Sequence, residues 1–375
     1  MTTLTVLQTL PALNAGGVER CTLETARALV AAGHRSVVVS SGGRMVAQLL
    51  AEGSEHITLP VERKSLLTLL QVAPLRRLLE TLQPDIIHAR SRVPAWLAWL
   101  ALRKLPAVTH PHLVTTMHGL HSVSPYSAIM TRGEAVIAGS KTVRDYILKN
   151  YPGCPPERIQ LIPEGVDPQE FPYGYQPDVR WLQGWQREFP QLAGKTVLAL
   201  PGRLTRLKGH ALFIDLIAAL QTDHPSVHGL IIGGAETGKT GYRREIEAHI
   251  AGAGLGAHIT LTGHRSDMRE VISQCDLVFS LSTKPESFGR TVLEAIRLGK
   301  PVIGWDLGGV GEILSACYPA GRVACAGGPD TATHQLLATT RGWLAAPTHP
   351  ADSPLYRLDS MCTQTLALYR TVAGK

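Results

Sequence analysis

Short apolar runs alternate with segments of helical periodicity along the whole chain of 375 residues. Runs rich in Val, Ile and Leu that are too short for helices are typical of the buried strands of a parallel sheet. In the first half they are 4–10, 36–40, 56–60, 85–89, 112–119, 134–140 and 158–167. In the second half they are 196–203, 228–234, 258–263, 277–283 and 301–306. This alternation predicts an α/β fold of parallel sheets covered by helices.

The rhythm is interrupted near the middle of the chain, where four prolines and a cluster of aromatic residues fall within 168–193. Such a break is typical of a connector between domains. We therefore expect two similar α/β domains at 1–168 and 195–350, joined by a linker at 169–194. The last segment, 351–375, has helical spacing of apolar residues and predicts a terminal helix. A cleft between two such domains is a usual place for a ligand.

Composition narrows the class of protein. Hydrophobic residues make up 44% of the chain, which excludes a fully disordered polypeptide. No apolar run reaches the roughly 18 to 20 residues of a membrane-spanning helix. The opening residues lack a basic segment and a cleavage site, so they predict a buried strand and no signal peptide. The six cysteines are scattered without metal-binding spacing, which favours reduced thiols and a cytoplasmic location.

Positive charge is concentrated in residues 61–110. This segment carries eight basic and three acidic side chains, beside the apolar stretches SLLTLLQVAPLRRLL and PAWLAWLALRK. Two interpretations remain open: amphipathic helices packed on a core, or a surface that contacts anionic lipid. Basic residues interleaved with aromatic ones are lacking, so nothing favours nucleic acid as a partner.

The segment GGAETGKT at 233–240 satisfies the pattern of a phosphate-binding P-loop. The matching residues are Gly233, Gly238, Lys239 and Thr240. Its position argues against an NTPase, since a P-loop usually follows the first strand of its domain and needs an acidic strand end for Mg²⁺. Here it follows the second strand, and Asp306 is the one plausible carboxylate. We therefore expect Gly233 and Gly234 to border a ligand and Lys239 to face solvent.

A stronger indication lies in ALPGRLTRLKGH, residues 199–210. Arg203 and Lys208 fall on the loop after a strand, and in an open α/β sheet such loops surround the ligand site. Two fixed cations suit a diphosphate, because Arg grips oxygens in a fork and Lys supplies a compact charge. Two cations that only lie in solvent on the surface would give the same sequence. This segment alone therefore does not decide between a diphosphate site and a solvated surface.

Two glutamates follow in KPESFGRTVLEAIRLGKPVIG, residues 284–304. Glu286 and Glu294 flank the start of a predicted helix near Gly289, and eight residues of helix span about 12 Å. Carboxylates accept hydrogen bonds from hydroxyls, and a helix N-terminus offers free N–H groups to anionic oxygens. Together with the two cations, this arrangement favours a nucleotide-diphosphate sugar over two helix-surface glutamates.

These segments resemble the retaining glycosyltransferases of family four, which have the GT-B fold. The resemblance includes GRLTRLKG, PESFGRTVLEAIRLGKPVIGWDLGGVGEIL and the opening LNAGGVERCTLETARALVAAGHRSVVVSS. DIIHARS, TTMHG, VIAGSKTVRDYI and IPEGVD follow in the family's order, so the similarity covers nearly the whole chain. It implies two Rossmann-like domains facing each other across a cleft. The first binds the acceptor, the second binds the donor, and the C-terminal helix packs back on the first.

The resemblance also implies roles for individual residues. Arg203 and Lys208 hold the donor diphosphate, Glu286 binds hydroxyls of the transferred sugar and Glu294 binds the ribose. The other implied contacts are Gly16, Gly17 and Gly233 near the donor, backbone N–H groups near Phe288 and Gly289, and His118 beside the reacting sugar. Two positions depart from the family: Glu164 stands where Asn is common, and Arg90 where a second His is frequent.

The implied reaction transfers a sugar, with a UDP-sugar as the expected donor, to a glycan or lipid-linked acceptor of envelope or lipopolysaccharide synthesis. The acceptor hydroxyl gives its proton to the departing phosphate oxygen, and the two cations stabilise the negative charge. No metal site and no further cofactor is expected. With such an acceptor, the basic 61–110 segment would attach to the inner face of the cytoplasmic membrane. The alternatives are a sugar-nucleotide epimerase, a phosphorylase and a non-catalytic nucleotide-sugar binding protein.

Overall fold

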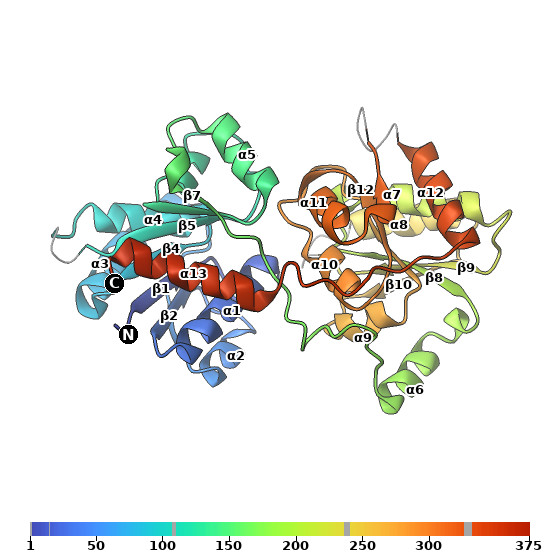
Figure 1. Cartoon of the computed structure of the whole chain (residues 1–375), viewed down its shortest axis with the longest axis horizontal. Helices are drawn as coiled ribbons and strands as arrows, with labels where there is room; N and C mark the ends of the chain where they lie inside the picture. Colours follow the sequence, from blue (N-terminus) through green and yellow to red (C-terminus); the bar gives the residue numbers. More distant parts are fainter. Residues whose placement is uncertain (1, 15, 107–109, 236–240, 326–331) are drawn as a thin grey trace. The chain divides into compact units, whose positions relative to one another are not determined.

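The computed structural model describes residues 2–14, 16–106, 110–235, 241–325 and 332–375. It divides the chain into two compact units (Figure 1). Unit 1 consists of Met1–Gly165 and Tyr356–Lys375, and unit 2 is Val166–Leu355. Each unit contains one parallel sheet with helices packed against it, which confirms the predicted fold of two α/β domains.

Unit 1 is built on a seven-stranded parallel sheet with the order β3-β2-β1-β4-β5-β6-β7. Its strands are β1 (Thr5–Thr9), β2 (Arg35–Ser40), β3 (Glu55–Thr58), β4 (Ile86–Ala89), β5 (His112–Met117), β6 (Ala135–Ala138) and β7 (Ile159–Leu161). All residues of β4 and β6 are buried, as expected for strands covered by helices on both faces. All seven strands overlap the apolar runs that the sequence predicts, and β2 and β3 begin one residue earlier, at Arg35 and Glu55.

The helices of unit 1 follow the strands in alternation. They are α1 (Gly17–Ala31), α2 (Val46–Ala51), α3 (Val72–Leu82), α4 (Arg92–Leu102) and α5 (Lys141–Asn150), with 3₁₀ helices η1 (Leu66–Gln71), η3 (Ser127–Thr131) and η4 (Pro156–Arg158). Ser140 caps α5, since its hydroxyl accepts a hydrogen bond from the Val143 N–H at 3.1 Å. This cap satisfies one of the N–H groups that a helix start leaves without a partner.

The C-terminal helix α13 (Leu358–Ala373) belongs to unit 1, although unit 2 precedes it in the chain. Figure 1 shows it in red beside α1. Its apolar face packs with Cys21 and Leu29 of α1, and the Tyr369 hydroxyl lies 2.6 Å from Nδ1 of His88 on β4. These contacts confirm that the C-terminal helix packs back on the first domain. Leu355 lies in the segment 351–375 that was expected to be helical, but it precedes the helix and is exposed.

Unit 2 contains a six-stranded parallel sheet with the order β10-β9-β8-β11-β12-β13. The strands are β8 (Thr196–Pro201), β9 (Val227–Ile232), β10 (Ile259–Gly263), β11 (Leu277–Ser280), β12 (Val302–Trp305) and β13 (Arg322–Val323). The helices are α6 (Val179–Glu188), α7 (His210–Leu220), α8 (Gly241–Gly252), α9 (Met268–Ser273), α10 (Arg290–Arg297), α11 (Gly308–Cys317) and α12 (Thr333–Ala345). Short 3₁₀ helices are η5 (Pro190–Leu192), η6 (Arg206–Lys208) and η7 (Pro319–Gly321).

The segment 169–194, expected as a linker, is part of unit 2 and contains α6. Its aromatic residues pack within the unit: Trp181 stacks on Trp185, with ring centroids 5.3 Å apart. The Trp181 indole also donates a hydrogen bond of 2.9 Å to Asp267. The prolines suggested a connector. Burial of the aromatic rings instead holds this segment on the rest of unit 2.

Candidate functional site

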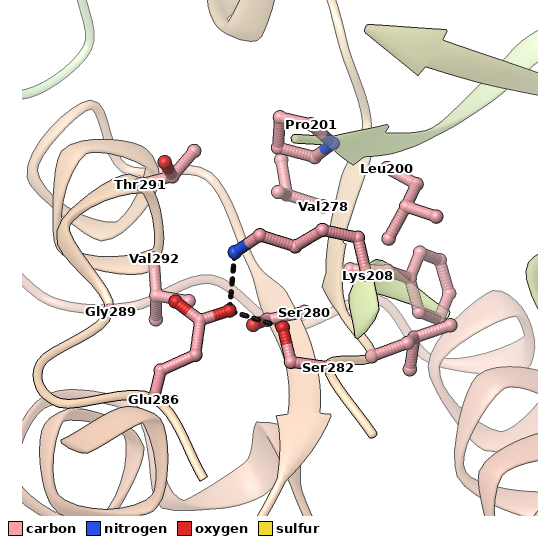
Figure 2. Close-up of a pocket in the computed structure, with 12 residues that line it drawn as sticks. Leu200, Pro201, Lys208, Val278, Ser280, Ser282, Glu286, Gly289, Thr291 and Val292 are labelled. Carbon is pink, nitrogen blue, oxygen red and sulfur yellow. Dashed lines mark hydrogen bonds and ion pairs between the residues drawn. The ribbon is translucent and has the colours of Figure 1, made fainter. Parts of the chain in front are cut away.

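The loops after β8 and β11 carry the site of unit 2. These strands are neighbours, with Leu198 paired to Leu277, so their carboxyl ends meet at one edge of the sheet. Lys208 lies in η6 after β8, and Glu286 lies on the loop between β11 and α10. The Lys208 Nζ and Glu286 Oε1 atoms are 2.6 Å apart (Figure 2). Two residues 78 positions apart in the chain thus form a direct ion pair.

Ser282 also contacts Glu286, and the sequence alone did not indicate this serine as a site residue. Its hydroxyl donates a short hydrogen bond to the same Glu286 oxygen that Lys208 reaches (Figure 2). The exposed fractions of the Lys208 and Glu286 side chains are 30% and 25%. Both groups are therefore held in place while remaining accessible to a ligand.

Glycines shape both loops where no other residue would fit. Gly209 has φ 76°, and a Cβ there would lie 2.2 Å from the main-chain carbonyl oxygen of Leu281. Gly289 has φ 104°, and its Cβ would lie 2.8 Å from Cγ2 of Val310. Both φ values are accessible mainly to glycine. The close approach lets Lys208 and the start of α10 face the same pocket.

That pocket combines several kinds of ligand-binding group. The described residues that line it are Leu200, Pro201, Lys208, Val278, Phe279, Ser280, Leu281, Ser282, Glu286, Gly289, Thr291 and Val292. They offer an ammonium, a carboxylate and hydroxyls at the beginning of α10, where helix N–H groups lack intrahelical acceptors. An ammonium and helix N–H groups suit anionic oxygens, and a carboxylate suits hydroxyl donors. The pocket therefore fits a ligand that carries both anionic oxygens and hydroxyl groups.

Two of the four charged residues expected here lie apart from the Lys208–Glu286 contact. Arg203 is exposed and is outside the set of described residues that line the pocket. Glu294 is buried within α10, and Nε of Arg290 lies 3.1 Å from its Oε1 atom. All four residues nevertheless stand on the loops and helix that follow β8 and β11. The structure thus brings Lys208 and Glu286 into contact, whereas Arg203 and Glu294 lie outside this contact.

The remaining expected residues of unit 2 support the loops. Phe288 is buried. A Cβ at Gly233 would lie 1.9 Å from the carbonyl oxygen of Gly202, so this glycine allows the ends of β8 and β9 to approach. Gly238, Lys239 and Thr240 of the P-loop pattern lie outside the described residues. Asp306, considered as its Mg²⁺ ligand, forms an ion pair with Arg322.

Unit 1 carries the other expected residues. Gly17 begins α1, and Gly16 precedes it with φ 144°. His118 follows β5, and its side chain is buried, with 6% exposed. Burial lowers the pKa of His118; Glu164 opposes this shift and Arg90 adds to it. Arg90 and Glu164 are the two residues that depart from the family pattern, and the structure brings both to His118.

Contacts on the two sides of the His118 ring have the same length. Nδ1 lies 3.4 Å from Glu164 Oε1, and Nε2 lies 3.4 Å from Arg90 Nη1. In the part of the chain that the structure describes, no three His, Cys, Asp or Glu side chains gather in a way that could hold a metal ion.

Comparison with protein families finds a match in each half of the chain. Residues 15–170 match the family described as Glycosyltransferase Family 4, and residues 185–331 match Glycosyl transferases group 1. The chain belongs to the family-four glycosyltransferases. Both matches together cover most of unit 1 and unit 2, and the two sheets are the two domains of the GT-B fold of these enzymes.

Individual relatives are distant in sequence but similar in structure. A D-inositol 3-phosphate glycosyltransferase from Stackebrandtia nassauensis is 24% identical over 60% of the chain and 54% of its own length. The chain thus aligns with about half the length of such curated relatives. A glycosyltransferase from Rickettsia africae is 25% identical with a TM-score of 0.80, covering 99% of each chain. HepE from Anabaena, solved with UDP-glucose, is 21% identical with a TM-score of 0.76, covering 98% of this chain and all of HepE.

Proposed function

We propose that this chain is a retaining glycosyltransferase that moves a sugar from a nucleotide-diphosphate donor, with UDP as the nucleotide, to a hydroxyl of an acceptor. One observation carries the proposal: the Lys208 ammonium and the Glu286 carboxylate meet at 2.6 Å beside the start of α10. A cation for phosphate and a carboxylate for sugar hydroxyls are what such a donor requires. Membership of the family and the UDP-glucose complex of HepE support the same reading.

Glu286 is suited to bind the sugar because its orientation is fixed. Lys208 and Ser282 both contact Oε1, so Oε2 is the oxygen that we assign to accept hydroxyl hydrogen bonds. A carboxylate offers about four acceptor sites over its two oxygens. Lys208 has three N–H donors, of which one serves Glu286, and we assign the others to phosphate oxygens.

The remaining roles follow from position on the loops. In our proposal Arg203 is the second cation on the diphosphate, Glu294 binds the ribose, and the N–H groups at Phe288 and Gly289 bind anionic oxygens. Gly233 borders the nucleotide. In unit 1, His118, Gly16 and Gly17 border the sugar and phosphate. Unit 1 would then bind the acceptor, and unit 2 the donor.

In our proposal the reaction is one substitution at the anomeric carbon of the donor sugar. The acceptor oxygen forms a bond to the anomeric carbon while the bond from that carbon to the phosphate oxygen breaks. The acceptor proton passes to the departing phosphate on the same face of the sugar, so configuration is retained. Lys208 and Arg203 would stabilise the negative charge that grows on that phosphate.

The decisive experiment has two stages. Thermal-shift screening against UDP-, GDP- and ADP-sugars identifies the donor, since a ligand that binds the native state alone raises the melting temperature. The chosen donor, labelled in its sugar, is then incubated with extracts of lipid-linked glycans. Release of nucleotide diphosphate together with label in a larger product, α-linked from an α-linked donor, supports the proposal. Free epimerised sugar nucleotide, or binding without turnover, would favour the epimerase or the binding protein.

For the acceptor, we propose a membrane glycolipid, reached from the cytoplasmic face. Four leucines of η1 point away from the core: Leu66, Leu67, Leu69 and Leu70 are 85%, 72%, 47% and 68% exposed. Arg63, just before them, has 84% of its side chain exposed, and Lys64 is also exposed. Exposed leucines beside cations suit an anionic lipid surface. The other helices of this basic segment, α3 and α4, bury apolar faces in the core.

Among the described residues there is no helix with the length and apolarity to cross a bilayer. Vesicle sedimentation tests attachment: the protein should bind vesicles containing phosphatidylglycerol more than pure phosphatidylcholine. A Leu66→Ser, Leu70→Ser variant should bind less, and a Val179→Ser variant, altered at an exposed residue of unit 2, should bind normally. Vesicle binding that depends on neither anionic lipid nor η1 would contradict this attachment, and no vesicle binding at all would favour a soluble phosphorylated polyol as acceptor, as the name of the Stackebrandtia relative suggests.

A further inference from the structure

Arg90 is an unusual cation because it is 97% buried, with an exposed fraction of 3%. Its Nε donates to the Gln8 side chain of β1 at 2.8 Å, and Nη2 donates to the Thr25 hydroxyl of α1, also at 2.8 Å. A third contact, 3.3 Å long, runs from Nη1 to the Cys21 sulfur. These contacts from β1 and α1 fix the guanidinium plane, so that Nη1 also faces Nε2 of His118.

The opposite side of His118 faces a carboxylate. Glu164, near the end of the first segment of unit 1, has an exposed side-chain fraction of only 12%. Its Oε1 lies 3.4 Å from Nδ1 of His118. The buried cation and the largely buried anion therefore flank one imidazole, and each offsets the desolvation cost of the other.

The two partners impose one protonation pattern on the ring. A carboxylate only accepts hydrogen bonds, so Nδ1 must carry the proton. A guanidinium only donates, so Nε2 must present its lone pair. Both contacts specify the same neutral tautomer, and each nitrogen is engaged by the protein.

We propose that Arg90 and Glu164 are positioning residues that act as a pair and hold His118 as the neutral Nδ1–H tautomer with a fixed ring orientation. The inference rests on the proposed function only in placing His118 beside the reacting sugar. In that reaction His118 then supplies shape and a fixed contact surface, and it transfers no proton. The acceptor proton goes to the departing phosphate instead.

The surrounding titratable groups are consistent with a neutral ring. His88, on β4, engages the Tyr369 hydroxyl of α13 through Nδ1 and the Thr116 hydroxyl of β5 through Nε2. Its burial holds its pKa well below the usual value. His121, on the loop that follows His118, has a pKa lowered to about 4, first by burial. Neither histidine is charged at neutral pH, so Arg90 and Glu164 dominate the field at His118.

A spectroscopic test reads the tautomer without any substrate. The wild-type protein, labelled with ¹⁵N-histidine, should show a protonated Nδ1 and an unprotonated Nε2 for His118, assigned by comparison with a His118→Asn variant. This pattern should persist from pH 6 to pH 8, a range chosen because unperturbed histidine titrates within it. A protonated Nε2, or titration of the ring within this range, would overturn the proposal. Because the readout needs no turnover, it stands even if the proposed transferase activity fails.

A double-variant cycle tests the pairing through activity. Arg90→Gln and Glu164→Gln should each lower kcat/KM, because each leaves one buried charge uncompensated. The double variant should be at least about fivefold more active than the product of the two single losses predicts, since residues in one network couple. Independent losses that simply multiply would contradict the pair.

A surface pair provides the matched control. Arg35 and Glu55 form an exposed ion pair of 2.7 Å, and Arg35→Gln with Glu55→Gln should change activity less than about twofold, alone or together. If Arg90→Gln does not fold, Arg90→Lys, which keeps the charge, tests the pair by the spectroscopic readout instead. His118 should then keep its tautomer in Arg90→Lys, and a change of tautomer there would refute the charge argument.

Discussion

Replacing Lys208 by Met removes the ammonium that we assign to the donor diphosphate while keeping a side chain of similar length. The loss of one donor to developing negative charge lowers kcat by about 10²–10³, which corresponds to about 2.7–4 kcal/mol of transition-state stabilisation. The same change affects stability much less. The Lys208 and Glu286 side chains are 30% and 25% exposed, and a pair of this exposure contributes on the order of 1 kcal/mol or less.

The two magnitudes separate a functional role from a structural one. Initial rates of sugar transfer should fall at least about 100-fold, whereas the melting temperature should fall by only about 2–4 °C. Lys195→Met is the matched control: it removes the same charge from an exposed position just before β8, at the opposite end of that strand. It should keep wild-type rates. Comparable rates for the Lys208 and Lys195 variants, with all donors that bind, would refute the assignment of the diphosphate to Lys208.

Three further predictions concern stability. Glu294→Gln should lower the free energy of unfolding by about 3–5 kcal/mol in urea titration, because it leaves the largely buried Arg290 cation without this carboxylate; an unchanged midpoint would contradict this. Gly209→Ala should cost about 1–3 kcal/mol more than Gly194→Ala. Both glycines have positive φ, but a Cβ clashes only at Gly209, and equal costs would refute the clash. Burial lowers the pKa of His210 to about 4; its folded value is below its unfolded one, so its contribution is complete above about pH 6.5 and is lost as the pH falls to about 4. Measured by calorimetry, His210→Phe should lose less stability over this pH range than the wild type does. An identical pH profile for the two proteins would exclude His210 as the source of the loss.

Strand positions were predictable because strands buried on both faces read as continuous apolar runs, which need no tertiary information. The placement of 169–194 in unit 2 has an equally clear reason. Prolines mark interruptions of regular structure, but they do not reveal whether nearby aromatic rings find a surface to pack on. In unit 2, Trp181 stacks on Trp185 and donates a hydrogen bond to Asp267. Asp178 caps the helix that carries both tryptophans.

The expectation that the P-loop match is a coincidence stays a prediction, since Gly238, Lys239 and Thr240 lie outside the described residues. The spacing of this pattern matches at each specified position, yet it follows the second strand of unit 2, and the expected carboxylate Asp306 is paired with Arg322. Local spacing by itself does not fix chemistry, because chemistry depends on what other segments bring to the same place.

The amino-acid sequence by itself determined the alternation of strands and helices, the residue types at the donor loops and the family, since these depend on local pattern. Only the tertiary structure decided which charges meet. It paired Lys208 with Glu286, added Ser282 to that contact, and buried Glu294 against Arg290. It also joined Arg90 and Glu164 across His118. Contacts between segments far apart in the chain arise from sheet order and loop packing, and no local pattern encodes them.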